Sequence, residues 1–142
     1  MDKAMERHTL TLTNKISELE KIRDGLERLG EAWGVDPQTC MSVNLALEEA
    51  FTNIVNYAFE NNDPQEIVID MNKADDRLSI TITDEGRPYD PTQNPEPDTS
   101  LPAEERPIGG LGIFLIRKIM DEVAYERNGN KNHLTLVKQL NT

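Results

Sequence analysis

The chain contains very little cysteine: Cys40 is its one example in 142 residues. A disulfide within the chain is therefore excluded, and a reducing cytoplasm is the simplest setting. A catalytic thiol is also disfavoured, because Cys40 falls inside an amphipathic helical pattern and neither histidine lies near it in sequence.

Long apolar runs are missing as well. No stretch approaches the roughly 20 apolar residues that span a bilayer. The first ten residues, MDKAMERHTL, carry charges and lead into no apolar core, unlike a signal peptide. We therefore expect a cytoplasmic protein without a membrane segment.

Positive charge is scarce: 15 basic residues stand against 26 acidic ones, which gives a net charge of −11. No cluster of lysine and arginine marks one face, so binding to nucleic acid or to an anionic membrane surface is disfavoured. A free nucleotide is compatible with this charge, provided that backbone amides and a metal ion meet its phosphates.

The length and composition fit one domain, which we expect to cover residues 1–142. Thr9 to Thr13 alternates like a strand, and helical spacing then runs from Ile16 to near Gly34. Asp36-Pro37 is typical of a helix start. The helix that follows has its apolar residues at i, i+3, i+4 and i+7 and should end near residues 60–64; they are Val43, Ala46, Leu47, Ala50, Phe51, Ile54, Val55 and Ala58.

The second half of the chain is predicted to add strands and a helix. Residues 67–71 and 78–82 alternate and predict a β-hairpin, and six of the eight prolines then fall between Pro88 and Pro107. Such a long irregular stretch is typical of a functional lid or a disordered loop. Gly109 to Met120 predicts glycines followed by an apolar helix. With strands at 123–127 and 133–140, this completes an α+β, two-layer α/β sandwich with helices on one sheet face.

The second helix offers the first candidate site residues. At about 100° per residue, Glu49, Asn53 and Asn56 share one flank just outside the apolar arc, and Glu48 projects to the opposite flank. A carboxylate and an amide one turn apart could share a magnesium ion and a water. A solvated polar flank has the same spacing, so this motif alone leaves both interpretations open.

Asp84-Glu85-Gly86 is the second candidate motif, at the end of a predicted strand. A strand-end Asp followed by Gly can set a carboxylate beside a flat ligand that approaches where a side chain is missing. An ordinary turn has the same composition.

Gly109-Gly110-Leu111-Gly112 is the third motif, and it opens a predicted helix. Glycines at a helix start present bare N–H groups to phosphate. No Lys-Ser/Thr follows, which excludes a P-loop, and Leu115 replaces the third glycine of a dinucleotide fingerprint. A flexible hinge is the other interpretation.

The three motifs in this order resemble a known family. Glu48-Glu49-Ala50-Phe51-Thr52-Asn53, Asp84-x-Gly86 and Gly109-Gly110-Leu111-Gly112 are similar to the N box and the two glycine boxes of the GHKL (Bergerat-fold) ATPases. The short Glu-Ala-x-Thr-Asn box and the Gly-Gly-Leu-Gly-Ile run most resemble bacterial anti-sigma-factor serine/threonine kinases. The resemblance covers essentially the whole chain. It implies a mixed, mostly antiparallel sheet, covered on one face by about three helices, and an ATP lid at about 87–109.

The resemblance also implies a role for each motif residue. Asn53 would coordinate Mg²⁺, and Glu49 would orient or deprotonate the attacking hydroxyl. Asp84 would accept the adenine amino group, while Gly86 lets the ring approach. Backbone amides of the glycine loop would meet the phosphates of ATP; they belong to Gly110, Leu111 and Gly112.

The implied activity is transfer of the γ-phosphoryl group of ATP to a serine or threonine of a STAS-domain anti-anti-sigma protein. Family members alternatively hold a sigma factor, often as homodimers. The sequence names neither partner and does not establish the oligomeric state. It also leaves open whether kinase activity is retained, since a non-catalytic, nucleotide-gated binding module or a scaffold without nucleotide would share the fold.

Several residues depart from the family pattern. Arg106 is separated from the glycine loop by Pro107-Ile108, so its role is open, and Tyr57 stands where some members have histidine. The last strand lacks the usual Gly-Thr pair, which leaves His133 or Thr135 as candidates to contact adenine. An autophosphorylating histidine kinase is disfavoured, because His8 and His133 fall on or beside strands.

Overall fold

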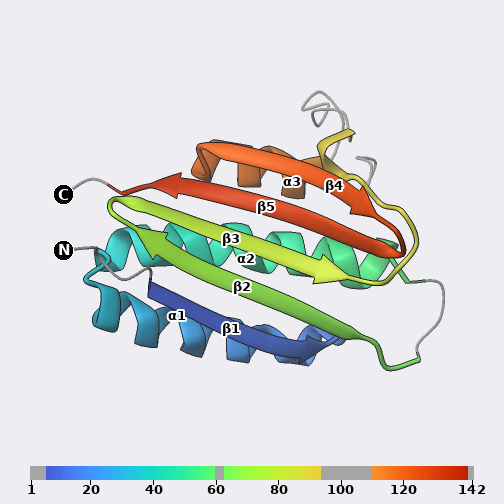
Figure 1. Cartoon of the computed structure of the whole chain (residues 1–142), viewed down its shortest axis with the longest axis horizontal. Coiled ribbons are helices and arrows are strands. Elements are labelled where there is room, and N and C mark those ends of the chain that lie inside the picture. Colours follow the sequence, from blue (N-terminus) through green and yellow to red (C-terminus); the bar gives the residue numbers. More distant parts are fainter. Residues whose placement is uncertain (1–5, 60–62, 94–109, 141–142) are drawn as a thin grey trace.

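The computed structural model describes residues 6–59, 63–93 and 110–140 as one two-layer α+β domain. The described residues form three α-helices, and Figure 1 shows helices covering one face of the sheet. The described residues also include two short 3-10 helices, Ile16–Glu18 and Pro91–Gln93. The elements are β1 (Glu6–Thr13), α1 (Leu19–Trp33), α2 (Pro37–Tyr57), β2 (Glu66–Ala74), β3 (Arg77–Asp84), α3 (Gly110–Ile119), β4 (Glu122–Asn128) and β5 (Lys131–Gln139).

The sheet has the strand order β1-β2-β3-β5-β4, and its four strand pairings are all antiparallel. The expected fold class is confirmed, but the expectation of a mixed sheet is wrong for the strands described. Tight turns explain two of the four pairings, β2–β3 and β4–β5, because Asp75 and Gly129 adopt positive φ angles of 56° and 59° and each joins two neighbouring strands. The β3–β5 register sets Asp84 opposite Asn132.

Local sequence signals define α2, which carries the first candidate motif. Asp36 accepts a hydrogen bond from the Thr39 backbone N–H at 3.1 Å, and Pro37 occupies the first turn. The preceding helix α1 ends at Gly34, whose φ of 69° suits a residue without a side chain. These two boundaries agree with the prediction, but α2 ends at Tyr57, before the predicted 60–64, and α1 begins at Leu19, after a 3-10 turn.

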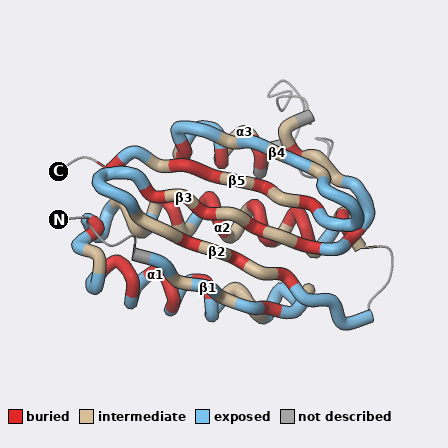
Figure 2. The backbone as a smooth tube through the Cα atoms, in the orientation of Figure 1, coloured by how far each residue is buried: buried red, intermediate tan, exposed pale blue. Residues whose placement is uncertain are grey.

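The core lies between the sheet and the helices. Residues at alternate positions of β3 and β5, such as Ile80, Ile82, Leu134 and Leu136, are buried against α2 and its neighbours. Figure 2 shows this alternation along the central strands. Because side chains alternate along each strand, the position of a residue at a strand end decides whether its side chain lies on the helix-covered face or on the open face of the sheet.

The proline-rich part of the predicted lid, with Arg106 and Gly109, lies outside the described residues, as do the side chains of Gly110, Leu111 and Gly112. The helix predicted after the glycines is confirmed as α3, with Gly110 as its first residue. None of the helices in the described ranges is long and apolar enough to cross a membrane.

Candidate functional site

The three predicted motifs gather at one end of the molecule. Figure 1 shows α2 and β3 ending there and α3 beginning there, and α2 packs against α3. Gly86, just after β3, contacts Ala58, just after α2. Segments that lie far apart in the sequence therefore border one site.

Asn53 lies one turn before the end of α2 and is only 5% exposed. Its amide nitrogen Nδ2 is buried and has no hydrogen-bond partner among the described residues. The sequence placed Asn53 outside the apolar arc, but α2 packs against α1 on one side and α3 on the other, so a wider part of its surface is covered. A buried amide without a partner requires an explanation, and a ligand is one.

Glu48 and Glu49 differ in their surroundings. Glu48 accepts a hydrogen bond from the Asn44 amide and lies 4.0 Å from Arg23 of α1. Glu49 is half-buried, lies one turn before Asn53, and has no hydrogen bond or ion pair with any described residue. Of the two carboxylates, Glu49 is therefore the one with no structural interaction of its own.

Asp84 ends β3 as a buried carboxylate, 2% exposed. Its Oδ1 accepts hydrogen bonds from the Gly86 backbone N–H at 2.8 Å and from Asn132 Nδ2 at 2.9 Å. Burial raises the pKa of Asp84, while these two hydrogen bonds and the nearby Arg127 guanidinium oppose the shift. The two bonds fix one carboxylate oxygen, and Oδ2 accepts no hydrogen bond from the described residues.

Asn132 was not predicted as a site residue. Its Nδ2 also donates to the Arg87 carbonyl oxygen at 2.8 Å, and its Oδ1 accepts from the Tyr125 hydroxyl and, at 3.1 Å, from Arg127. The side chain is 3% exposed and thus fully engaged in a buried network. A signal was present: Asn132 is the polar first member of the series 132, 134 and 136, which otherwise points leucines at the core.

His133 and Thr135, the two candidates for an adenine contact, lie on the opposite face of the sheet. Side chains alternate along a strand, so the neighbours of Asn132 and Leu134 point away from the helices. His133 Nδ1 lies 3.1 Å from Thr83 Oγ1, and Thr135 Oγ1 lies 3.3 Å from Thr81 Oγ1. Neither side chain can touch a ligand bound beside Asp84 on the helix-covered face.

Gly86 is needed for packing. A Cβ atom there would overlap the carbonyl oxygen of Ala58. The next residue, Arg87, donates its backbone N–H to that same carbonyl and its Nε–H to the Tyr57 carbonyl, both at 2.8 Å. The segment after β3 is thereby tied to the last turn of α2.

Two tyrosine rings close this part of the site. Tyr57 of α2 stacks on Tyr89, with ring centroids 5.6 Å apart. The Tyr57 hydroxyl is buried and has no hydrogen-bond partner among the described residues. Since Tyr57 lies one turn after Asn53, the same side of α2 presents two polar groups without partners.

Known proteins resemble this chain over most of its length. The family model described as "Histidine kinase-like ATPase domain" matches residues 12–138. The chain is 35% identical over 95 residues to the serine/threonine-protein kinase BtrW of Bordetella bronchiseptica, which covers 67% of each chain. It is 31% identical over 122 residues to the serine-protein kinase RsbW of Listeria monocytogenes, covering 83% of this chain and 78% of that protein.

Solved structures share the fold. The structure of the RsbU and RsbW domains of Rv1364c from Mycobacterium tuberculosis matches 95% of this chain with a TM-score of 0.69 and 16% identity. This chain spans 32% of that longer one. The histidine kinase domain of Erythrobacter litoralis EL346 matches 88% of this chain and 60% of its own, with a TM-score of 0.56 and 15% identity. The sheet covered by three helices, the motif order and the match over residues 12–138 together show that the chain belongs to the histidine kinase-like ATPase domain family.

Proposed function

We propose that this protein binds ATP with Mg²⁺ and transfers the γ-phosphoryl group to a serine or threonine hydroxyl of a partner protein. The observation that carries the proposal is the pair on α2: a buried Asn53 whose Nδ2 has no partner among the described residues, one turn after a Glu49 carboxylate that makes no hydrogen bond or ion pair with them. Relatives at 31–35% identity are named serine or serine/threonine kinases, which supports the reaction class.

Asn53 suits a magnesium ion that is delivered with the nucleotide. An amide oxygen is a hard ligand, so Oδ1 of Asn53 would hold the ion, while the unpartnered Nδ2 would donate to an oxygen of the nucleotide. Within the described ranges no three His, Cys, Asp or Glu side chains gather to hold a metal. Mg²⁺ usually takes one or two protein oxygens and completes its shell with phosphates and water, so a single Asn ligand fits this chemistry. The ion would neutralise charge on the phosphates.

Asp84 is proposed to receive the adenine amino group. Its Oδ1 is held by Asn132 and by the Gly86 N–H, which leaves Oδ2 for a donor on the ligand. A carboxylate fixed before binding loses little freedom when the ligand arrives. Gly86 has two roles in this proposal. Its missing side chain allows the segment after β3 to pack against Ala58 at the end of α2. It also allows the adenine ring to approach closely, as the family resemblance implies.

The phosphates are proposed to lie at the start of α3. Gly110, Leu111 and Gly112 form its first turn, where backbone N–H groups have no partner within the helix. The helix dipole also favours negative charge at this end. These amides offset the overall negative charge of the protein where a polyphosphate would bind.

Glu49 is proposed as the general base. The acceptor hydroxyl oxygen would bond to the γ-phosphorus while the bond from this phosphorus to the β–γ bridging oxygen breaks, and ADP leaves. The hydroxyl proton passes to the Glu49 carboxylate. Phosphoryl transfer depends mainly on charge neutralisation and in-line positioning, and a positioned base adds about 10²–10⁴-fold.

The acceptor class follows from the family resemblance. A STAS-domain anti-anti-sigma protein is proposed as the phosphorylated partner, and a sigma factor as the alternative partner of a homodimeric kinase. Both partner classes belong to transcriptional control, so the proposed reaction takes place in the cytoplasm.

Labelled ATP with a STAS-domain protein tests the kinase proposal. Wild type and Glu48→Ala should transfer label to the STAS protein, whereas Glu49→Ala should bind Mg·ATP normally and lose at least about a hundredfold in rate. Equal labelling by wild type and Glu49→Ala would contradict the assignment of the base. Nucleotide-dependent binding of the partner without label transfer would instead indicate the non-catalytic module.

A further inference from the structure

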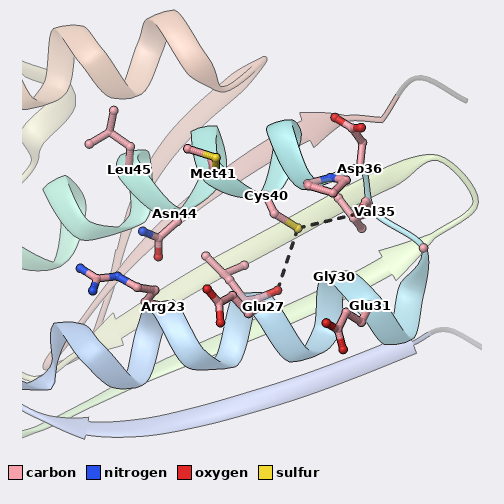
Figure 3. A pocket seen from close by; sticks show the side chains of 13 residues that line it. Arg23, Glu27, Gly30, Glu31, Val35, Asp36, Cys40, Met41, Asn44 and Leu45 are labelled. Carbon is pink, nitrogen blue, oxygen red and sulfur yellow. Dashed lines mark hydrogen bonds between the residues drawn. The ribbon is translucent and has the colours of Figure 1, made fainter.

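A groove lies between α1 and α2, away from the site described above. Its volume is about 1160 Å³, and it runs from Arg23 to Gly34 along α1 and from Asp36 to Leu45 along α2. Figure 3 shows the labelled side chains of α1 and α2 along its two sides. At 1.5 Å per residue the α1 side is about 16 Å long, which matches roughly three turns of a helix laid beside it.

The floor and one edge of the groove are apolar. Leu26 and Val35 form part of the floor, and Met41 and Leu45 of α2 form the edge. Met41 is 74% exposed and Leu45 44% exposed. Ile16 is the one other large apolar side chain among the described residues with such exposure, so two of three exposed large apolar residues border this groove.

The rim of the groove is acidic. Glu27, Glu31 and Asp36 line it and are exposed, against one cation, Arg23, which lies 4.0 Å from Glu48. Glu27 and Glu31 make no ion pair with any described residue, and they are four residues apart on one helix. Like charges at this spacing repel each other. A cation from outside would relieve this repulsion.

A reactive thiol does not explain the groove. Cys40 Sγ lies at its base, 3.9 Å from the Leu26 carbonyl oxygen and 4.0 Å from that of Val35. Burial, together with the negative charge of Asp36, raises the pKa of the Cys40 thiol. The thiol therefore stays protonated and packs as a small apolar group.

We infer that this groove is a docking site for an amphipathic helix of a partner protein whose apolar stripe is flanked by lysine or arginine. The apolar floor and edge would take the stripe, and Glu27, Glu31 and Asp36 would face the basic flanks. A second copy of this chain fits less well, because a symmetric contact would bring two acidic rims together. The inference concerns a different face from the proposed nucleotide site and stands without it.

Fluorescence anisotropy with a designed peptide tests the inference. The probe is a labelled helical peptide of about 14 residues, with leucines at i, i+3, i+4 and i+7 and lysines on both flanks. A second peptide carries glutamate in place of every lysine. The lysine peptide should bind, and its affinity should fall as the salt concentration rises. The glutamate peptide should not bind.

Matched variants locate the binding site. The pair Glu27→Gln with Glu31→Gln should weaken binding about tenfold, and Met41→Ser with Leu45→Ser by at least as much. The control pair Glu20→Gln with Asp24→Asn has the same spacing on α1, and Ile16→Ser removes a similarly exposed apolar residue; both lie outside the groove and should leave affinity unchanged.

Three results would overturn the inference. The first is absence of binding by the lysine peptide, and the second is an equal loss in the groove variants and in their controls. The third is a change of oligomeric state in sedimentation when Met41 and Leu45 are replaced, because the groove would then be occupied by a second copy.

Discussion

Asp84 and Asn132 face each other across β3 and β5, and the Asn132 amide donates to Asp84 Oδ1 at 2.9 Å. The same Asn132 side chain accepts from Tyr125 and Arg127 of β4. Asn132 of β5 thereby holds the Asp84 carboxylate directly, and two side chains of β4 hold Asn132 in place. The orientation of the carboxylate is set by the sheet before any ligand binds, which is the arrangement that a specific contact needs.

Replacing Asn132 by alanine should disturb both the site and the fold. The Tyr125 hydroxyl loses its partner and Asp84 loses one donor, so we expect the free energy of unfolding to fall by about 1–3 kcal/mol. Affinity for Mg·ATP should fall about tenfold, measured by calorimetry. Thr135→Val, on the open face of the same strand, should leave nucleotide affinity unchanged, and an equal loss there would refute the role of Asn132.

Asp84→Asn should separate stability from nucleotide binding. An amide nitrogen would replace Oδ2 and present a donor to the adenine amino group, so affinity should drop about tenfold to a hundredfold. At neutral pH the variant should be at least as stable as wild type, because it no longer buries a charge.

The stability difference between wild type and Asp84→Asn should depend on pH. Burial raises the folded-state pKa of Asp84 above its ordinary value of 3.8, so between 3.8 and the raised pKa the folded protein binds a proton that the unfolded chain does not. Wild-type stability therefore falls as pH rises through this window. The advantage of Asp84→Asn in urea unfolding should shrink as pH is lowered towards 3.8; a gap that widens on acidification would be inconsistent with this.

Asn53→Ala should abolish stabilisation by nucleotide at little cost to the free protein. The Asn53 Nδ2 has no partner among the described residues, so removing it leaves no donor of the protein unpaired. With Mg·ATP at 100-fold its wild-type Kd, thermal unfolding of the wild type should show about 2.7 kcal/mol of stabilisation, and the variant almost none. Asn56→Ala, exposed on the same helix, is the matched control and should behave like wild type.

Gly86→Ala should destabilise the protein by about 1–3 kcal/mol, because the new methyl group overlaps the Ala58 carbonyl oxygen. The obstacle is backbone, so adding Ala58→Gly should not restore stability. Urea unfolding of both variants measures this, and full rescue by the second substitution would show that the clash lies with the Ala58 side chain instead.

Most elements of the fold can be predicted from local sequence patterns. Periodicity and caps placed α1 and α2 and predicted where α1 ends and α2 begins, since Asp36, Pro37 and Gly34 act through local backbone geometry. Alternation predicted the two hairpins, though β1 is longer than expected because pairing with β2 extends it to Glu6. The motif residues Glu49, Asn53, Asp84 and Gly86 were also visible in the sequence, as were the glycines of α3.

Tertiary structure alone decided how these residues are used. The register of β3 against β5 made Asn132, and not His133 or Thr135, the neighbour of Asp84, and a shift of one residue would have reversed this choice. The packing of α2 between two helices buried Asn53, and the fold of α1 against α2 created the acidic groove. Contacts of this kind join residues distant in sequence, so no local pattern records them, whereas helix caps and strand alternation depend on neighbours along the chain.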